Sequence, residues 1–288
     1  RNDLGFTKNE NGVVDKILAH PYGLVLLTGP TGCGKSTTLY SFLKEVNKPD
    51  VNIVTVEDPV EYTMRGVNQT QVNVKANMTF ATALRSILRQ DPNVIMIGEI
   101  RDTETAQIAV RASITGHLVL STLHTNNSLT TIERLLDMEV ERYLLASALS
   151  GIVSQKLARK LCDKCKKLRD TTPYEKQMFK KYLGLDVNQI YDAVGCPECS
   201  GGYKGRIALQ EVLLISPNIR DAISSKISKA ELRNLVYSDD VITLLQDGLY
   251  KVIAGLTSTE EVIKLVEADD EMNAETKMKS INKNNQPN

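Results

Sequence analysis

A glycine-rich loop between a short apolar run and a helical pattern is the feature that most constrains this chain. Residues 24–28 (LVLLT) lead directly into residues 29–36 (GPTGCGKS), and residues 37–46 then have the pattern of a helix. Glycines let backbone amides close around an anion, and the start of a helix adds a partial positive charge. In this strand–loop–helix context the motif predicts a nucleotide triphosphate site. The predicted binding residues are Gly29, Pro30, Thr31, Gly32, Cys33, Gly34, Lys35, Ser36 and Thr37.

Three side chains of this loop have distinct expected roles. We expect Lys35 to reach the β- and γ-phosphates and to be essential for catalysis, Ser36 to hold Mg²⁺, and Thr37 to contact an outer phosphate. Cys33 fills the loop, and we assign it no redox role. The alternative is a glycine-rich turn that binds nothing, and the lysine, the hydroxyl and both flanks argue against it.

Further apolar runs show how the phosphate loop is built into a sheet. They occupy residues 52–56, 94–97 and 118–122, and helical patterns separate them at 79–90 and 103–113. Continuous apolar strands that alternate with helices indicate a mostly parallel sheet covered on both faces. The predicted fold class is therefore α/β, with a phosphate-loop core.

Composition divides the chain into segments. Residues 129–160 are interpreted as two helices joined near Met138-Glu139, and helical periodicity is expected to resume after the cysteine-rich part and continue to about Val266. The first residue is not methionine, so we expect a fragment of a longer protein. The predicted segments are an entry segment (1–20), an ATPase core (21–160), a four-cysteine module (161–205), a helical subdomain (206–267) and a disordered tail (268–288). That residues 1–20 are a linker from a missing N-terminal domain is what the family resemblance described below implies.

Acidic residues follow two of the predicted strands. Glu57 comes directly after the second apolar run, and Glu99 follows the third run after one glycine. Parallel sheets collect ligands at the carboxyl ends of their strands, where carboxylates can hold Mg²⁺ and position an attacking water. We therefore predict that Glu57 and Glu99 are catalytic. A helix cap or an arginine partner would explain Asp58 and Glu61 equally well.

Five cysteines are present, and four of them form two Cys-x-x-Cys pairs with thirty residues between the pairs. Four thiolates in two such turns are typical of a tetrahedral zinc site, which is closed to water and therefore structural. Free cysteines or a redox pair are the alternatives, and neither pair opens the helix that a redox motif needs. The predicted zinc ligands are Cys162, Cys165, Cys196 and Cys199.

Charge and hydropathy exclude several classes of protein. The 35 basic and 35 acidic residues give no formal net charge, so no overall field favours nucleic acid or anionic lipid. No apolar run approaches the ~20 residues that span a bilayer. Together with the reduced cysteines that zinc requires, this predicts a cytoplasmic protein without direct membrane insertion.

Three longer motifs give the chain a family resemblance. Residues 54–62 (VTVEDPVEY), 88–102 (LRQDPNVIMIGEIRD) and 111–126 (RASITGHLVLSTLHTN) resemble the Asp box, Walker B motif and His box of the secretion-motor ATPases. The resemblance extends from about Leu4 to Val266. It implies a RecA-like core, a homohexameric ring and Mg²⁺-dependent ATP hydrolysis coupled to filament assembly at the inner face of the cytoplasmic membrane. It also implies inner-membrane platform and assembly proteins as partners, docking mainly through the missing N-terminal domain.

Two histidines flank the fourth apolar run and have different expected roles. His117 and His124 are seven residues apart, so extended chain separates them by roughly 20–25 Å and they cannot share one phosphate. His124, at the carboxyl end beside Glu99, is the predicted γ-phosphate sensor, with a structural histidine as the alternative. At the far end of the strand, His117 is as well explained by a structural role as by a subunit contact.

Four arginines are candidates for signals between subunits. Arg85 and Arg89 lie four residues apart on one predicted helix face, where they pair with local acids or project toward a neighbouring subunit. Arg101 follows Glu99 by two residues. The resemblance places Arg206 near the nucleotide or a neighbouring subunit, and a plain surface arginine is the alternative.

The predicted function is that of a motor that assembles type IV pili, with type II secretion as the alternative in the same family. Assembly motors of the family often carry the four-cysteine module, whereas the retraction relatives lack it. The lean toward pili rests on the asparagine- and lysine-rich tail, which suggests a low-GC bacterium. A RecA-like motor on nucleic acid and a scaffold without turnover are the alternatives from other classes. The neutral charge argues against the first, and the intact lysine and glutamates argue against the second.

Overall fold

The computed structural model describes residues 1, 4–237 and 241–270, which belong to two compact units. Unit 1 comprises residues 1–155 and 210–243, and unit 2 comprises residues 156–209 and those from 244 onward. The chain therefore passes from unit 1 into unit 2 after residue 155, returns to unit 1 at residue 210, and enters unit 2 again at residue 244. The boundaries predicted at residues 160 and 205 fall inside two long strands, β6 (Leu149–Leu161) and β9 (Tyr203–Leu214).

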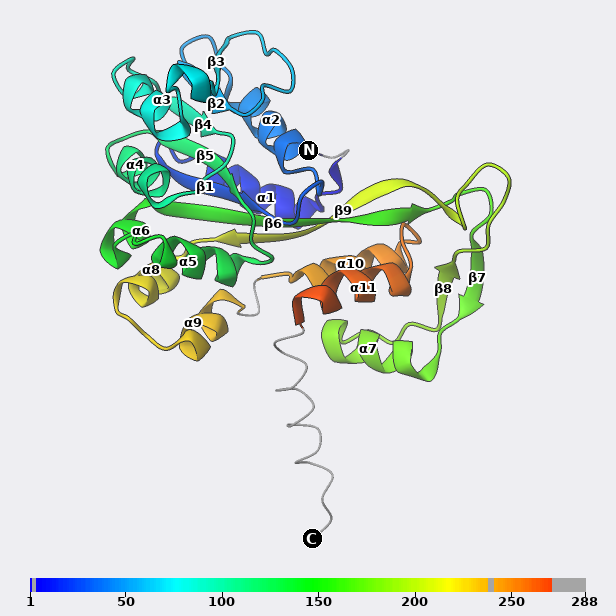
Figure 1. The fold of residues 1–288 in the computed structure, drawn as a ribbon. Coiled ribbons are helices and arrows are strands. Elements are labelled where there is room, and N and C mark those ends of the chain that lie inside the picture. The colour runs from blue at the N-terminus through cyan, green and yellow to red at the C-terminus, as the bar shows by residue number, and fades with distance from the viewer. Residues whose placement is uncertain (2–3, 238–240, 271–288) are drawn as a thin grey trace. The chain divides into compact units, whose positions relative to one another are not determined.

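The main sheet has seven strands in the order β3-β2-β4-β5-β1-β6-β9 (Figure 1). Strand β1 pairs in parallel with β5, β5 with β4, and β4 with β2, as the continuous apolar runs predicted. The sheet also pairs β3 in parallel with β2, and β6 in parallel with β1. The strands are β1 (Gly23–Thr28), β2 (Ile53–Glu57), β3 (Val67–Gln71), β4 (Val94–Ile97), β5 (Leu118–Leu123), β6 and β9.

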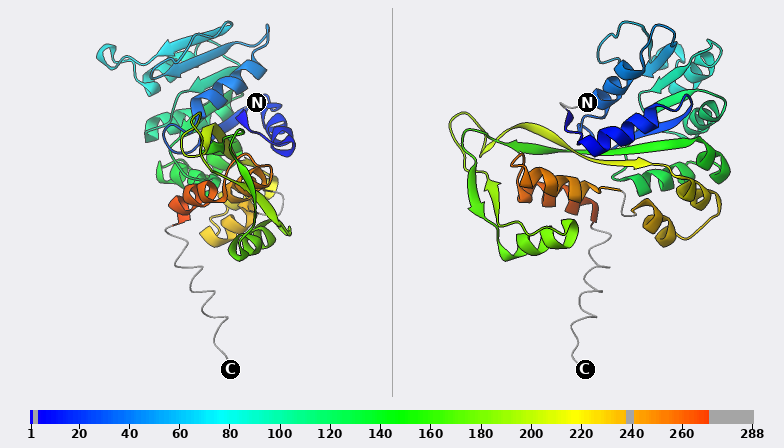
Figure 2. Two further views of the ribbon diagram at one scale, coloured as in Figure 1. Left: turned by 90° about the vertical axis from the view of Figure 1, so that its right-hand side faces the viewer. Right: turned by 180° about the vertical axis from the view of Figure 1, so that it is seen from behind.

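Helices cover both faces of this sheet in unit 1. Alternate residues of β1 enter two different apolar clusters, with Leu24 and Leu26 on one face and Val25 and Leu27 on the other. Helices α1 (Lys8–Leu18) and α2 (Lys35–Val46) cover the second face, and α1 lies toward the viewer in the right-hand view of Figure 2. The first face packs against α3 (Phe80–Ile87), α4 (Thr103–Ile114), α5 (Ser128–Asp137), α6 (Arg142–Ala148), α8 (Pro217–Ser224) and α9 (Lys229–Val236).

Two predictions of helix are wrong where the chain forms long strands. The second helix expected within residues 129–160 ends at Ala148, and β6 begins at the next residue. Helical structure was also expected from residue 206, but β9 continues to Leu214. Both strands are buried over most of their length, and a buried strand and a buried helix give similar apolar runs. The paired β-branched residues Ile152 and Val153 were the available signal for a strand.

Unit 2 has its own small core. Helices α7 (Pro173–Leu183), α10 (Leu244–Ile253) and α11 (Thr259–Asp270) pack with the two-stranded antiparallel sheet β7 (Lys167–Asp170) and β8 (Gln189–Asp192). Its buried apolar residues include Phe179, Leu209, Leu249 and Val262. Residues 268–270 of the predicted tail belong to α11, and residues 271–288 lie outside the described residues. Within the described ranges, the chain forms no helix that is both long and apolar enough to cross a bilayer.

The first twenty residues contain a well-defined helix. Thr7 caps α1, and its backbone amide and side chain exchange hydrogen bonds with Glu10 in a capping box. Ile17 lies against β6 so closely that a Cβ built on Gly151 would be 2.4 Å from its Cδ1. A glycine is therefore required at residue 151 for α1 to approach the sheet.

Adding one methyl group at this contact should destabilise unit 1. We expect Gly151→Ala to lower the free energy of unfolding by about 1–3 kcal/mol, because Ile17 must move to accommodate the new Cβ. The midpoint of urea denaturation measures this effect. Gly12→Ala is the matched control, since Gly12 lies inside α1 with open space around it, and it should stabilise by about 0.5–1 kcal/mol. Equal effects of the two changes would contradict the packing described here.

Candidate functional site

The phosphate loop joins the carboxyl end of β1 to the first turn of α2. Gly34 occupies the N-cap position with φ of 89°, a left-handed conformation that favours glycine, and it has no side chain to occupy the helix amides. Gly29 has φ of 145°, and a Cβ there would be 2.1 Å from the backbone oxygen of Gln155. Ser36 and Thr37 are exposed at the start of α2. The local fold is thus that of an anion-binding helix N-terminus.

The Lys35 ammonium is buried within this loop. Its Nζ donates to the carbonyl oxygens of Gly29 at 2.7 Å and Pro30 at 3.0 Å. Burial lowers the pKa of Lys35, while the nearby Cys33 and the carboxylate of Glu99 act in the opposite direction. The predicted lysine and the predicted carboxylate are therefore close enough to interact.

Gln155 of β6 holds the loop from the sheet side, and sequence reasoning missed it. Its Nε2 donates to the carbonyl oxygen of Cys33 at 2.6 Å, and its Oε1 accepts from Thr38 of α2 at 2.9 Å. The Gln155 side chain also accepts from Gln210 at 3.4 Å, and both residues are fully or almost fully buried. The glutamine was overlooked because its strand was interpreted as a helix. Its contacts fix both the loop and the helix that follows it.

Glu99 lies just beyond β4, between Arg101 and His124. Its Oε1 accepts from Arg101 at 2.5 Å, and its Oε2 lies 3.3 Å from Nε2 of His124. Burial by itself would raise the pKa of Glu99, but the hydrogen bond and charge of Arg101, with a contribution from His124, hold it below its ordinary value. Glu99 is therefore ionised at neutral pH, as a group that holds a metal or orients water must be.

Glu57 has a different environment from Glu99. Only 3% of it is exposed, and its two carboxylate oxygens accept hydrogen bonds from Tyr40, Thr55 and Gln69. By contrast, Asp58 is exposed and lies 3.9 Å from Arg101. The two predicted catalytic carboxylates, Glu57 and Glu99, thus lie at the same edge of the sheet. Glu57 is enclosed, whereas Glu99 is partly exposed.

His124 and the loop after β5 are held beside the phosphate loop. Thr28, the last residue of β1, donates its hydroxyl to the backbone oxygen of Thr125 at 2.6 Å. The His124 side chain is 48% exposed at this edge, so it can reach a ligand as a phosphate sensor must. His117 lies at the opposite end of β5, where its Nδ1 is 2.9 Å from the carbonyl oxygen of Ala112. The contact closes the turn after α4, which is a structural role.

The arginines predicted to signal between subunits have local surroundings. Arg85 pairs with Glu104, and Arg89 donates to Ser86 at 3.3 Å. Both lie on or just after α3, and Arg101 pairs with Glu99 as described. Arg206 is exposed on β9. Local acids therefore account for Arg85 and Arg101, and the signalling roles stay predictions.

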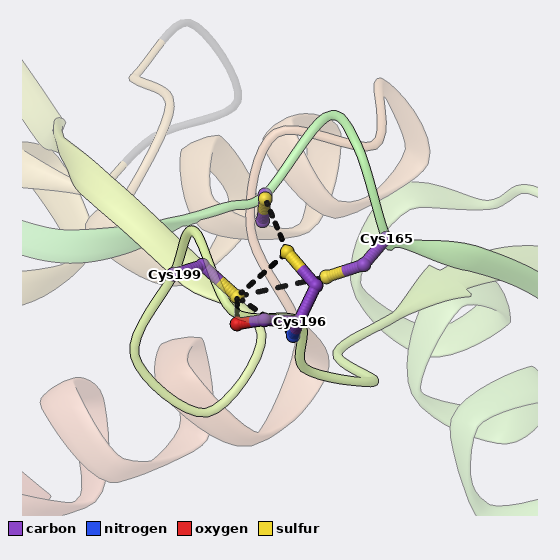
Figure 3. A group of neighbouring side chains, drawn as sticks. Cys165, Cys196 and Cys199 are labelled. Atoms are coloured by element: carbon purple, nitrogen blue, oxygen red, sulfur yellow. Dashed lines mark hydrogen bonds between the residues drawn. The ribbon is translucent and has the colours of Figure 1, made fainter.

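The four cysteines of unit 2 come together in one cluster (Figure 3). Their sulfur atoms all lie within 4.8 Å of one another. The separation is 4.0 Å for Cys162 and Cys196, 3.7 Å for Cys165 and Cys199, and 3.6 Å for Cys196 and Cys199. A tetrahedral zinc ion with bonds of about 2.3 Å needs sulfur atoms about 3.8 Å apart. The geometry fits zinc bound by four thiolates.

Contacts within the cluster shift the pKa values of its thiols in different directions, and burial is the largest effect that raises the pKa of Cys165 to about 11. The amide of Cys196 donates to Sγ of Cys199 at 3.2 Å. Burial raises the pKa of the Cys199 thiol. Hydrogen bonds from backbone amides and neighbouring thiols outweigh this effect and lower the pKa to about 7. Lys164 and Glu198, which lie inside the two Cys-x-x-Cys turns, form an exposed ion pair at 2.5 Å that links them.

Residues 1–264 match the family described as "Type II/IV secretion system protein". The chain belongs to this family. The match covers both units, so the resemblance drawn from the three sequence motifs is confirmed.

Curated members of the family are similar over almost the whole chain. The putative type II secretion system protein E of Escherichia coli K12 is 50% identical over 274 residues, which are 95% of this chain and 55% of that protein. The type IV pilus assembly ATPase PilB of Thermus thermophilus is 46% identical over 267 residues, 91% of this chain and 30% of that protein. The chain therefore spans about half the length of the first of these relatives, and less of the second.

Two solved structures share the fold of this chain. The crystal structure of the pilus retraction motor PilT with bound ADP is 31% identical, with a TM-score of 0.66 over 92% of this chain and 66% of that one. The Legionella pneumophila ATPase DotB has a TM-score of 0.67 at 24% identity and supports the fold alone. The predicted α/β class with a mostly parallel sheet, a cysteine cluster and helical C-terminal elements is confirmed.

Removing the arginine beside Glu99 should shift the pH dependence of any activity that needs this carboxylate. Arg101 holds the pKa of Glu99 low, so Arg101→Ala should raise that pKa and leave the carboxyl protonated at higher pH. The acidic limb of the pH–rate profile should therefore move to higher pH, with partial recovery in Arg101→Lys. Arg85→Ala is the control, because Arg85 pairs with the exposed Glu104, whereas the charged neighbours that lower the pKa of Glu99 are Arg101 and His124. An unmoved acidic limb in Arg101→Ala would show that Glu99 does not set it.

Replacing a single cluster cysteine should abolish metal binding. We expect Cys199→Ser to contain much less than one zinc per chain, because three thiolates no longer close the site. Elemental analysis of freshly prepared protein measures the stoichiometry. Cys33→Ser should retain the zinc of the unaltered protein, since Cys33 belongs to the phosphate loop in unit 1. Equal zinc content in the two variants would exclude the four-cysteine site.

Proposed function

We propose that this chain is the ATP-hydrolysing part of a motor that assembles a type IV pilus. The observation that supports this most strongly is the convergence of the phosphate loop, Glu99 and His124 at one edge of the sheet. Lys35 and Glu99 interact there, and Glu99 contacts His124 at 3.3 Å. Such a site combines a triphosphate cradle with an ionised carboxylate and a candidate phosphate sensor.

Each group has a role in the proposed reaction. The amides at the start of α2 and the Lys35 ammonium hold the β- and γ-phosphates, where they stabilise charge that develops as the terminal phosphate leaves. Ser36 and the ionised Glu99 would hold Mg²⁺, which would neutralise phosphate charge when bound, and Glu99 would orient the attacking water. His124 reports whether the γ-phosphate is present. The exposed fraction of His124 leaves it free to make that contact.

The proposed motor acts as a homohexamer in the cytoplasm, on the inner face of the cytoplasmic membrane. Its partners are the inner-membrane platform and assembly proteins of the pilus machine. Structural zinc stabilises unit 2 through the four cysteines, in keeping with the sulfur–sulfur distances. The named pilus relative, the PilB assembly ATPase, matches 91% of this chain.

Type II secretion is the second candidate function. The Escherichia coli relative named above is a putative type II secretion protein, and several others of similar identity are type II secretion proteins, including one from Aeromonas hydrophila that is 47% identical over 267 residues. The catalytic edge described here would serve either machine, because both uses need the same hydrolysis.

Loss of the phosphate-loop lysine should abolish hydrolysis. We expect the full-length Lys35→Ala protein with Mg-ATP to release phosphate at least about 100-fold more slowly, because the γ-phosphate loses its charged partner. Glu99→Gln should also be inactive but should still bind ADP. Continued turnover by Lys35→Ala at the original rate would refute the proposed site.

The same variants distinguish the two machines in cells. If the motor builds pili, Lys35→Ala in the chromosome removes surface pili and leaves protein secretion intact. Loss of secreted proteins with normal piliation would assign the chain to type II secretion instead. Unit 2 should remain folded in this variant, because Lys35 lies in unit 1 and the four clustered cysteines lie in unit 2.

A further inference from the structure

Glu57 is enclosed in a way that does not suit a group in contact with nucleotide. Its Oε1 accepts from the hydroxyl of Thr55 at 2.5 Å and from Nε2 of Gln69 at 3.2 Å, and its Oε2 accepts from the hydroxyl of Tyr40. All three donors are neutral, and the residue is 3% exposed. A carboxylate with both oxygens engaged and almost no exposed surface cannot also hold a metal ion or a water without breaking these bonds.

Tyr40 connects Glu57 to the phosphate-loop helix. Tyr40 lies on α2 four residues after Ser36, so the two share one face of the helix. The pKa of Tyr40 is raised, first by burial and then by its hydrogen bond to Glu57. The hydroxyl therefore remains protonated throughout the neutral range and acts as a permanent donor to the carboxylate.

The same tyrosine also contacts the far end of the acidic loop that follows β2. Its hydroxyl oxygen accepts from the backbone amide of Glu61 at 3.3 Å. Its ring stacks on that of Tyr62, with centroids 4.4 Å apart and planes 28° apart. Tyr40 thus holds both ends of residues 57–62, one through a side chain and the other through the backbone.

Between these two ends lie the accessible acids of the loop. Asp58 and Glu61 are exposed, and Asp58 is within 3.9 Å of Arg101, the residue that pairs with Glu99. The position of the loop therefore determines where its carboxylates stand relative to the Glu99 cluster. Tyr40 contributes to that position from α2, and β3 contributes from the other side, where Gln71 accepts from the amide of Val60 at 3.3 Å and Gln69 donates to the carbonyl oxygen of Tyr62 at 3.1 Å.

Resting on the ATP hydrolysis proposed above, we propose that Tyr40 and Glu57 are positioning residues that fix residues 58–61 against the phosphate loop. Glu57 then acts through the loop and not on the nucleotide. Its carboxylate is the anchor, Tyr40 is the link to α2, and Thr55 and Gln69 complete the cradle. Because Tyr40 and Ser36 belong to one helix, a shift of the phosphate loop moves the acidic loop with it.

Tyr40→Phe tests this role in the full-length protein. The change keeps the stacked ring but removes the donor to Glu57 and the acceptor for the Glu61 amide. We expect kcat for ATP hydrolysis to fall by about 10- to 100-fold, the scale of a small misplacement of reacting groups. The KM for ATP and the affinity for ADP should be unchanged, because the phosphate loop itself is intact.

Tyr62→Phe is the matched control. It removes the same kind of group, a tyrosine hydroxyl, from the residue whose ring stacks on Tyr40. Tyr62 is 46% exposed, and its side chain is not a donor to Glu57 in the described structure. Its kcat should equal that of the unaltered protein. An unchanged kcat in Tyr40→Phe would overturn the proposal, and so would a loss of ADP affinity equal to the loss of kcat.

A double-mutant cycle separates an anchor from a catalytic group. If Glu57 works only with Tyr40, then Glu57→Gln should lower kcat by a similar factor, and the two changes together should cost little more than either one. A much larger loss in Glu57→Gln, multiplied further by Tyr40→Phe, would make Glu57 a catalytic residue and overturn the anchor role. If Tyr40→Phe is too unstable to purify, Glu57→Gln still gives the comparison of kcat with ADP affinity.

The outcome is also distinct from failure of the proposed function. Absence of phosphate release in the unaltered full-length protein would refute hydrolysis itself. Release that depends on Lys35 but is indifferent to Tyr40 would refute only the positioning role.

Discussion

Parallel strands end at a common edge, and the chemistry of unit 1 depends on that geometric constraint. The pairing of β1 with β5 and of β2 with β4 brings the residues after four strands to one side of the sheet. The phosphate loop, Glu99 and His124 each follow a different strand there, and Glu57 is the last residue of a fourth strand. No single segment of the chain contains the site. The relative positions of its residues therefore depend on the register in which the strands pair.

Buried polar side chains then fix the loops at this edge. Gln155 holds the phosphate loop, Thr28 holds the loop after β5, and Tyr40 holds the loop after β2. In each case a neutral donor or acceptor bonds a backbone group or a carboxylate in a place that water does not reach. Because an unpaired polar group in such a place is costly, each loop has one strongly favoured position. The strands bring the loops together, and these hydrogen bonds set their final positions.

Local patterns in the sequence predicted the strands that end at the site. The runs before Gly29, Glu57 and Glu99 are short, apolar and bounded by glycine or acid, so their class and direction followed from the sequence. The cysteine spacing likewise predicted a cluster that the structure forms. By contrast, β6 and β9 mix apolar with polar residues and show no regular alternation, so their sequences did not distinguish strand from helix.

Long-range partners were beyond reach for a related reason. The Tyr40–Glu57 contact joins residues 17 apart, and Gln155 contacts Cys33 across 122 residues. A sequence pattern shows which side chains can form such bonds, but only the packed sheet selects which of them do. The burial of Glu57 could therefore not be predicted from the sequence. In the sequence, Glu57 and Glu99 both follow an apolar run, and that pattern does not distinguish an enclosed carboxylate from a partly exposed one.

The discontinuous course of unit 1 bears on the order in which the protein matures on the ribosome. Strand β9, which completes the seven-stranded sheet, is synthesised only after all four cysteines. Until then β6 offers an unpaired edge, the kind of surface that recruits wrong partners. Folding of residues 156–209 brings β6 and β9 together and so shortens the loop that the sheet must close. The strand that covers the edge of β6 is therefore available only after the segment with the four cysteines has been synthesised.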